Sequence, residues 1–166
     1  TLFAKGKAAA LETVRGMIHE PGTVAYVRQQ EPAGLGHAVC CARHLIHDEP
    51  VAVLLADDLI LGPSCLAEMV ASYQGGNMVA VMDVPKSETG SYGIITPGAD
   101  HGQLIEVSGL VEKPEPANAP SNIGVVGRYI IESEVFAQLG TQDRGAGNEV
   151  QLTDALARQI GKVPFH

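Results

Sequence analysis

In the stretch Val51-Ala-Val-Leu-Leu-Ala-Asp-Asp58, an unbroken apolar run leads directly into a pair of acidic residues. The run is too short for a typical helix and is rich in β-branched residues, so it predicts a β-strand. A strand that is apolar on both faces is typical of a parallel sheet covered by helices on both sides. The stretch therefore predicts a central strand of an α/β sheet, with two carboxylates at its carboxyl end.

The segments around this strand alternate between strand and helix patterns. An exposed amphipathic helix is expected over Phe3–Ile18, a strand over Thr23–Val27 and a second helix over His37–Leu45. A helix over Ser64–Tyr73 and a strand over Met78–Val84 follow the acidic pair. This order predicts a doubly wound, Rossmann-like α/β fold with a parallel sheet.

The pattern changes after Pro85, where turn residues separate short apolar segments. Short strands are expected over Tyr92–Thr96, Leu104–Val107, Gly109–Pro114 and Ile123–Ile131, and helices over Glu134–Leu139 and Leu152–Ile160. We expect the short strands to form antiparallel hairpins added to the main sheet, which makes it a mixed sheet. Val163-Pro-Phe-His166 has the pattern of a further strand, so we expect residues 1–166 to form a single domain that is incomplete at both ends.

Composition excludes several classes of protein. The formal net charge of −8 argues against a nucleic-acid partner, because binding a phosphate backbone requires a basic face. Cys40, Cys41 and Cys65 show neither metal-ligand spacing nor a disulfide framework, which indicates a reducing, cytoplasmic compartment. No apolar run approaches the length of a membrane span, so we expect no membrane association.

Asp57 and Asp58 are the first candidates for chemistry. Ligands of open α/β sheets bind beyond the carboxyl ends of the strands, where this pair is expected. Adjacent strand residues point to opposite sides, so we expect one carboxylate to face the crevice and the other to cap a helix or face solvent. Mg²⁺ held through one carboxylate and substrate phosphates is one interpretation; an acidic turn without a ligand is the other.

A second candidate is the Gly34-Leu-Gly36 loop, which opens a predicted helix. Its glycines permit close approach of the backbone to a ligand, and free N–H groups at a helix start attract anions. Gln29 precedes the loop, and its amide can pair with the edge of a base. An ordinary turn and a solvent-facing Gln29 remain the alternatives.

Glu112-Lys113-Pro114 places a carboxylate beside an ammonium at a strand end. The carboxylate can accept hydrogen bonds from sugar hydroxyls and the ammonium can neutralise a phosphate; the alternative is an exposed ion pair of little energetic value. Arg128 can stabilise a phosphate or face solvent. Thr153-Asp154 suits N-capping of a helix better than chemistry.

Taken together, these segments form a specific series that extends from residue 24 to about residue 160. The series comprises Val27-Arg-Gln29, Gly34-Leu-Gly-His-Ala38, Val51-Ala-Val-Leu-Leu-Ala-Asp-Asp58, Tyr92-Gly-Ile-Ile95, Gly109-Leu-Val-Glu-Lys-Pro114, Ala119-Pro-Ser-Asn122, Gly127-Arg-Tyr-Ile130 and Glu149-Val-Gln-Leu-Thr-Asp-Ala155. It closely resembles the bacterial UTP–glucose-1-phosphate uridylyltransferases.

The resemblance implies a nucleotidyltransferase-type Rossmann-like fold. It also implies an Mg²⁺-dependent reaction in which UTP and glucose 1-phosphate give UDP-glucose and pyrophosphate. Carried over by position, the resemblance assigns Gln29 and Gly36 to the uracil, Asp57 to Mg²⁺, Gly93, Glu112 and Gly127 to the glucose pocket, and Lys113 to the sugar phosphate. Asp57 and Lys113 are thereby the expected catalytic residues, whereas Asp58 matches a more variable family position.

Two parts of the family pattern have no counterpart in these residues. They are the N-terminal Gly-rich loop that grips the triphosphate and the C-terminal segment with a further lysine and an acidic metal ligand. We therefore expect these residues to form about half of an enzyme and to be inactive alone. Members of the family often form dimers or tetramers, so a homo-oligomer is a further possibility. The alternatives are a dTTP-dependent sugar-1-phosphate thymidylyltransferase and a non-catalytic sugar-nucleotide-binding module.

Overall fold

The computed structural model describes residues 4–141 and 143–166. The α-helices are α1 (Ala8–Gly16), α2 (Leu35–Cys41), α3 (Cys65–Ser72), α4 (Glu134–Leu139) and α5 (Leu152–Ala157). The strands are β1 (Val51–Leu54), β2 (Met78–Asp83), β3 (Gly93–Asp100), β4 (Ile105–Glu112) and β5 (Ile123–Ile131). Short 3₁₀ turns are η1 (Arg43–Leu45), η2 (Lys86–Ser91) and η3 (Ala146–Asn148).

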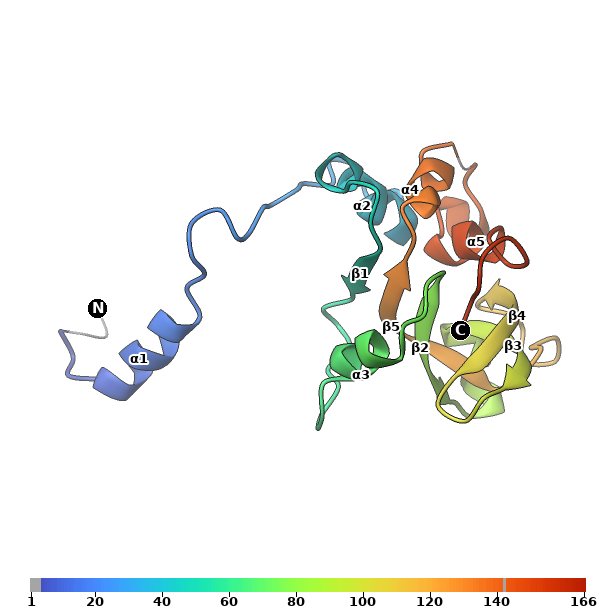
Figure 1. The fold of residues 1–166 in the computed structure, drawn as a ribbon, viewed down its shortest axis with the longest axis horizontal. Helices are drawn as coiled ribbons and strands as arrows, with labels where there is room; N and C mark the ends of the chain where they lie inside the picture. The colour runs from blue at the N-terminus through green and yellow to red at the C-terminus, as the bar shows by residue number, and fades with distance from the viewer. Residues whose placement is uncertain (1–3, 142) are drawn as a thin grey trace.

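The sheet is organised around β5, and every pairing between its named strands is antiparallel (Figure 1). Tyr129 of β5 lies opposite Val53 of β1 on one edge and opposite Val79 of β2 on the other. β1 and β2 are thus parallel to each other, but β5 lies between them. The expected parallel pairing is wrong for these strands, because a strand from much later in the chain occupies the position between them.

Helices cover both faces of the sheet, as predicted for an α/β fold. Tyr129 and Ile131 point into the main core, where α2, α4 and α5 pack against one another. Ile130 points to the other face and packs with Met69 of α3 and Met78. This alternation along β5 places one helical layer on each side of the sheet.

β1 is an edge strand in the described part of the chain, contrary to the expected central position. It pairs with β5 alone among the described strands. Val51 and Val53 are half-buried, whereas Ala52 is exposed and Leu54 is 50% exposed. The apolar run correctly predicted a strand, but burial of its second face depends on neighbours that the run itself does not specify.

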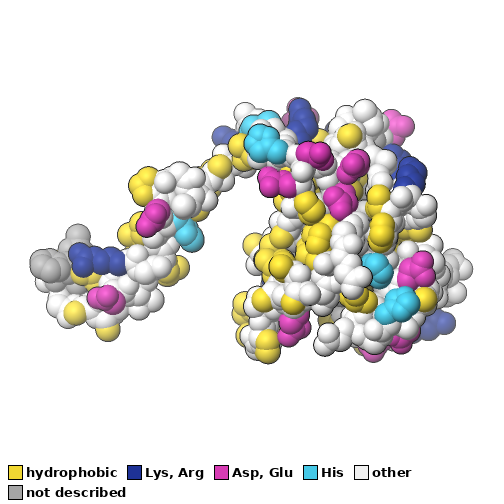
Figure 2. All heavy atoms as spheres, viewed as in Figure 1, with side chains coloured by type: hydrophobic (Ala, Val, Ile, Leu, Met, Phe, Trp, Pro, Cys, Tyr) yellow, Lys and Arg dark blue, Asp and Glu magenta, His cyan; other side chains and the backbone are white. Residues whose placement is uncertain are grey.

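The N-terminal segment forms an arm that extends away from the sheet (Figure 1). α1 lies within the predicted helix and has no buried residue, as expected; the predicted start at Phe3 lies outside the described residues. Thr23–Val27 is not a strand, and Tyr26 within it is 95% exposed. A strand needs a partner for its backbone groups, and no described strand lies beside this segment. Figure 2 shows hydrophobic side chains on the surface of this arm.

Other predicted elements are confirmed with small changes of boundary. The two strands expected over Leu104–Val107 and Gly109–Pro114 are one strand, β4, which forms a hairpin with β3. α3 begins as predicted, with the Ser64 hydroxyl accepting a hydrogen bond from the N–H of Ala67 at 3.3 Å. α5 ends at Ala157, three residues before the predicted Ile160.

The strand pattern of Val163–His166 is confirmed by its pairing. Phe165 forms a parallel bridge with Asn77, just before β2. The N–H of Val107 in β4 also donates to the carbonyl of Phe165 at 2.8 Å. This terminal segment therefore lies between β2 and β4. No helix in the described ranges is long and apolar enough to cross a membrane.

Candidate active site

The candidate site is a cavity of about 320 Å³ where several elements begin or end. The turn after β1, the start of β3, the end of β4, the middle of β5 and the start of α5 all contribute. The lining residues are Leu35, Leu55, Asp57, Asp58, Ser91, Tyr92, Gly93, Glu112, Lys113, Val125, Gly127, Tyr129, Glu149, Gln151, Leu152 and Thr153.

Five residues predicted to form the site meet in this cavity: Asp57, Gly93, Glu112, Lys113 and Gly127. They come from segments far apart in the sequence. The β3–β4 hairpin places Gly93 directly opposite Glu112. A larger hollow of about 450 Å³ elsewhere in the molecule contains none of them.

Gln29 and Gly36, predicted to contact the base, are not among the residues that line the cavity. The Gln29 amide nitrogen donates to the carbonyl of Gly34 at 3.1 Å and lies 2.9 Å from His37 Nδ1. Gly36 is buried, and its N–H donates to the carbonyl of Val150 at 2.8 Å. That N–H is therefore already used within the fold, although neighbouring Leu35 reaches the cavity wall.

Gly36 also has a packing role that the sequence did not reveal. A Cβ atom at this position would lie 2.7 Å from the Val150 carbonyl oxygen and 2.8 Å from Leu139 Cδ2. Any side chain would thus push α2 away from the segment that leads into α5. This close approach explains the glycine without reference to a ligand.

Asp57 and Asp58 are both among the residues that line the cavity, although we expected only one of them to face it. Alternation holds within a strand, but β1 ends at Leu54 and the acidic pair lies beyond it, in and just after a turn. Both residues are exposed. The pleat of β1 therefore does not assign the two residues to opposite sides.

Arg128 holds the turn that carries the acidic pair. Its guanidinium donates to the carbonyl of Leu55 at 2.8 Å, to that of Gly127 at 3.0 Å, and to that of Asp58. The backbone on both sides of Asp57 is thus attached to β5. The sequence allowed Arg128 either to stabilise a phosphate or to face solvent. In the structure its side chain instead links the turn after β1 to β5.

Gly127 is required by its backbone and by its neighbour. Its φ of +63° is in the left-handed region, which disfavours side chains. A Cβ atom here would also collide with the carboxylate of Asp58. The glycine therefore lets the acidic turn lie close against β5.

Glu112 is held by two neighbours. Thr153 Oγ1 donates to Glu112 Oε2 at 2.9 Å, and Lys113 Nζ lies 3.7 Å from Glu112 Oε1. The Glu112 side chain is 14% exposed and that of Lys113 is 59% exposed. The carboxylate is therefore held at the cavity wall by Thr153, whereas the Lys113 side chain is largely exposed to solvent.

Lys113 has an unusual backbone conformation, with a φ of +45°. Its N–H donates to the carbonyl of Tyr92 at 2.9 Å, which ties the end of β4 to the start of β3. A left-handed conformation is costly for a residue with a side chain, and such strain is often found at functional sites. Here it turns the chain between Glu112 and Pro114.

Tyr129 links the core to the cavity. It is buried at 5% exposure and lines the cavity wall. Burial, together with the carboxylates of Glu112, Asp58 and Asp57, raises the pKa of Tyr129 to about 12. The phenol is therefore neutral at physiological pH and presents no additional negative charge to a ligand.

The charged residues of the wall are mostly acidic. Asp57, Asp58, Glu112 and Glu149 line the cavity, and Lys113 is its only Lys or Arg among the lining residues. The described residues contain no group of three or more His, Cys, Asp or Glu side chains placed to hold a metal ion. The acidic pair can thus supply part of a cation shell, and substrate oxygens would have to supply the rest.

Sequence reasoning missed the roles of Thr153, Arg128 and Tyr129. Thr153 was expected to suit N-capping, but Gln151 occupies the N-cap position of α5 and makes no side-chain cap hydrogen bond. The contact between Thr153 and Glu112 joins residues 41 positions apart. Local pattern carries no signal for such a contact.

The chain matches the family model described as nucleotidyl transferase over residues 5–163. It is 47% identical to a UTP–glucose-1-phosphate uridylyltransferase of Komagataeibacter xylinus, with 100% of this chain and 60% of that protein covered. A protein of the same name from Bacillus subtilis (strain 168) is 46% identical, with 99% and 56% covered. The chain thus spans less than two thirds of the length of these relatives.

A solved structure also shows similarity to this family. The crystal structure of UDP-glucose pyrophosphorylase complexed with UDP-glucose superimposes with a TM-score of 0.86 at 37% identity. The match covers 96% of this chain and 62% of that chain. The predicted nucleotidyltransferase fold is therefore confirmed, with a sheet that is more antiparallel than expected.

Proposed function

Because the chain belongs to the nucleotidyl transferase family, we propose that the whole protein transfers the uridylyl group of UTP to glucose 1-phosphate. The products are UDP-glucose and pyrophosphate. The observation that carries the proposal is the meeting of Asp57, Glu112 and Lys113 in one cavity, from three separate segments. The names of the two relatives and of the solved structure support the choice of substrates. We assign the activity to the whole protein, of which residues 1–166 form part of one nucleotidyl transferase domain.

The sugar phosphate is assigned to the β3–β4 end of the cavity. Glu112, held by Thr153, accepts hydrogen bonds from sugar hydroxyls, and Gly93 opposite it leaves space for the ring. Lys113 neutralises the phosphate, since it is the exposed cation beside that carboxylate. Gly127 completes the wall. Gln29 and Gly36 do not line the cavity, and the resemblance alone assigns them to the uracil.

A divalent cation fits the charge of this cavity. Four acidic residues and one lysine line it, so a phosphate would be repelled unless a cation lowered the negative potential. Asp57 is the proposed Mg²⁺ ligand, with substrate phosphates completing the shell. Mg²⁺ bound there would draw charge from the α-phosphate of UTP.

The chemistry requires positioning more than acid–base catalysis. A phosphate oxygen of glucose 1-phosphate attacks the α-phosphorus of UTP, and the bond from that phosphorus to the pyrophosphate oxygen breaks. The attacking oxygen is already ionised, so no general base is needed. Lys113 reduces the repulsion between the two anions, and the fixed carboxylate of Glu112 orients the sugar.

The test is turnover by the whole protein supplied with UTP, glucose 1-phosphate and Mg²⁺, measured as pyrophosphate release. We expect UDP-glucose as the product, and a kcat/KM for UTP at least about tenfold above that for dTTP. Preference for dTTP would favour the thymidylyltransferase alternative. Binding of UDP-glucose without turnover would favour the non-catalytic module.

A further inference from the structure

The turn that carries Asp57 begins where the backbone pairing between β1 and β5 stops. β1 ends at Leu54, which lies opposite Arg128 of β5. One more backbone contact follows, in which the N–H of Leu55 donates to the Gly127 carbonyl at 2.9 Å. Beyond Leu55, no pairing between the described strands fixes the position of Asp57.

The guanidinium of Arg128 supplies the contacts that the backbone no longer makes. It donates to the carbonyl of Leu55 at 2.8 Å and to that of Asp58, so its hydrogen bonds lie on both sides of Asp57. In the described part of the chain, the contact with Asp58 is the only hydrogen bond that ties residues 56–63 to another segment. We call this set of side-chain contacts the Arg128 clamp.

The geometry gives Arg128 no direct contact with a ligand in the cavity. Arg128 is half-buried and is not among the residues that line the cavity. Its Nη1 donates to the carbonyls of Leu55 and Gly127. A guanidinium is planar and rigid, so these contacts fix the side chain as well as the turn. Arg128 can therefore act on a ligand only through the residues of the turn and through its charge.

We propose that Arg128 is a positioning residue, which raises the affinity of the site for a divalent cation by fixing the turn that carries Asp57. A carboxylate that is already held in place loses less conformational freedom when it binds a cation. The inference rests on the proposed function, which assigns Mg²⁺ to Asp57.

The charge of Arg128 acts in the opposite direction, because a guanidinium beside the acidic pair repels a cation. Asp57 and Asp58 are exposed, so solvent screens this repulsion, whereas the restriction of the turn is not screened. Position therefore outweighs charge. Since the two effects have opposite signs, substitutions at Arg128 can separate them.

Two substitutions in the whole protein make this separation. Arg128→Lys keeps the charge, but a single ammonium cannot donate on both sides of Asp57 as the planar guanidinium does. Arg128→Gln removes both the charge and the clamp. We expect both variants to bind Mn²⁺ alone at least about tenfold more weakly than the wild-type protein, read from the electron paramagnetic resonance signal of free Mn²⁺.

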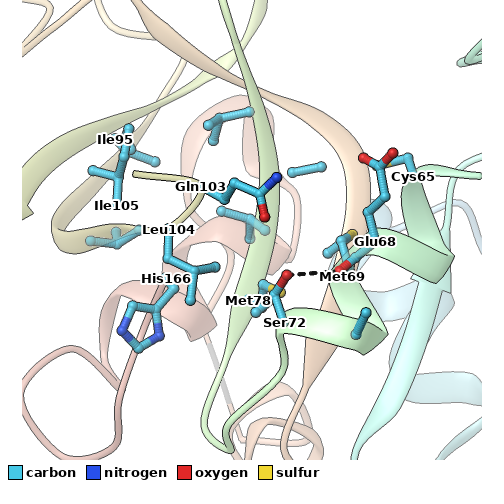
Figure 3. Close-up of a pocket in the computed structure, with 15 residues that line it drawn as sticks. Cys65, Glu68, Met69, Ser72, Met78, Ile95, Gln103, Leu104, Ile105 and His166 are labelled. Carbon is cyan, nitrogen blue, oxygen red and sulfur yellow. Dashed lines mark hydrogen bonds between the residues drawn. The ribbon is translucent and has the colours of Figure 1, made fainter. Parts of the chain in front are cut away.

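Glu68→Gln is the control for cation binding elsewhere on the protein. Glu68 belongs to α3 and is among the residues that line the larger hollow, of about 450 Å³ (Figure 3). None of the predicted site residues lines that hollow, so the Kd for Mn²⁺ should stay within about twofold of the wild-type value. Asp57→Ala is the opposite control and should weaken binding at least as much as the Arg128 variants.

Hydrogen exchange measures the clamp without metal or substrate. The Leu55 amide should exchange at least about fivefold faster in Arg128→Lys, because the end of the ladder between β1 and β5 opens more readily. The Lys113 amide, which donates to the Tyr92 carbonyl, should exchange at the wild-type rate. It thereby reports whether the β3–β4 side of the cavity is intact.

Steady-state kinetics completes the test. In Arg128→Lys, the Mg²⁺ concentration that gives half the maximal rate should rise, while the KM for glucose 1-phosphate stays within about threefold. Unchanged Mn²⁺ affinity in Arg128→Lys would overturn the proposal, and tighter binding in Arg128→Gln would assign the effect to charge instead. Faster exchange at both amides would also overturn it, because that result would indicate a general structural role. Absence of turnover in the wild-type protein would count against the proposed function, whereas Mn²⁺ binding and exchange would still decide the role of Arg128.

Discussion

Asp57 and Asp58 are adjacent, and both reach the cavity, yet we assign them different roles. Asp57→Ala in the whole protein should lower Mg²⁺-dependent kcat at least about a hundredfold, because the proposed cation would lose its protein ligand. Asp58→Ala should leave kcat within about threefold, since the clamp from Arg128 reaches its backbone carbonyl and survives the change.

The two variants control for each other, because each removes one carboxylate from the same turn. Initial rates across a range of Mg²⁺ concentrations distinguish loss of the cation from loss of folding. A variant pair in which Asp58→Ala is the inactive one would reverse the assignment.

Thr153 acts through Glu112, to which its hydroxyl donates. Thr153→Val keeps the shape and removes the hydrogen bond, so the KM for glucose 1-phosphate should rise about 5- to 10-fold while the KM for UTP changes little. Thr153→Ser retains the hydroxyl and should restore the KM. Steady-state kinetics with each substrate varied separately gives the comparison. Equal rises in both KM values would indicate a general structural defect instead.

At the scale of elements, the terminal segment Val163–His166 packs closely against the turn before β2. Gly76 has a φ of +79°, and a Cβ atom there would overlap the Pro164 carbonyl oxygen. Gly75 has a φ of +95° with nothing within 4 Å of its Cβ position. The two neighbours thus share a backbone conformation that only glycine adopts without strain, and they differ in packing.

We expect Gly75→Ala to lower the free energy of unfolding by about 1–2 kcal/mol through backbone strain alone. Gly76→Ala should lower it by about 3–5 kcal/mol, because the terminal segment must also move. Urea denaturation followed by circular dichroism measures both. An equal decrease in the free energy of unfolding for both variants would contradict this, because it would show that moving the terminal segment costs no free energy.

At the scale of the whole molecule, the described residues carry the side of the cavity that we propose for the sugar phosphate. The resemblance assigns the triphosphate-gripping loop, a further lysine and a second acidic ligand to segments that these residues do not contain. We therefore expect the 166-residue chain alone to turn over at less than about one thousandth of the rate of an intact relative. Pyrophosphate release by the chain, with circular dichroism as the check on folding, is the measurement. UDP-glucose formation near the intact rate would contradict it.

Most strands and helices could be predicted from local sequence pattern, with Thr23–Val27 as an exception, and five of the residues that meet in the cavity were predicted as well. The strands β1, β2 and β5 and the helices α3 and α4 lie where their apolar patterns predict them. These features are local: a period of two or of 3.6 residues is present in the residues themselves. The series of motifs likewise predicted a nucleotidyltransferase, and the match to the nucleotidyl transferase family model confirms that prediction.

Which segments lie side by side depends on long-range contacts that are visible in the folded molecule alone. It placed β5 between β1 and β2, left β1 at an edge, and brought Thr153 to Glu112 and Arg128 to the acidic turn. Such contacts join residues tens of positions apart, and their free energy depends on partners that no local pattern specifies. The acidic pair illustrates this difference: the sequence predicted Asp57 and Asp58 as candidates, and the tertiary structure placed both residues in the lining of one cavity.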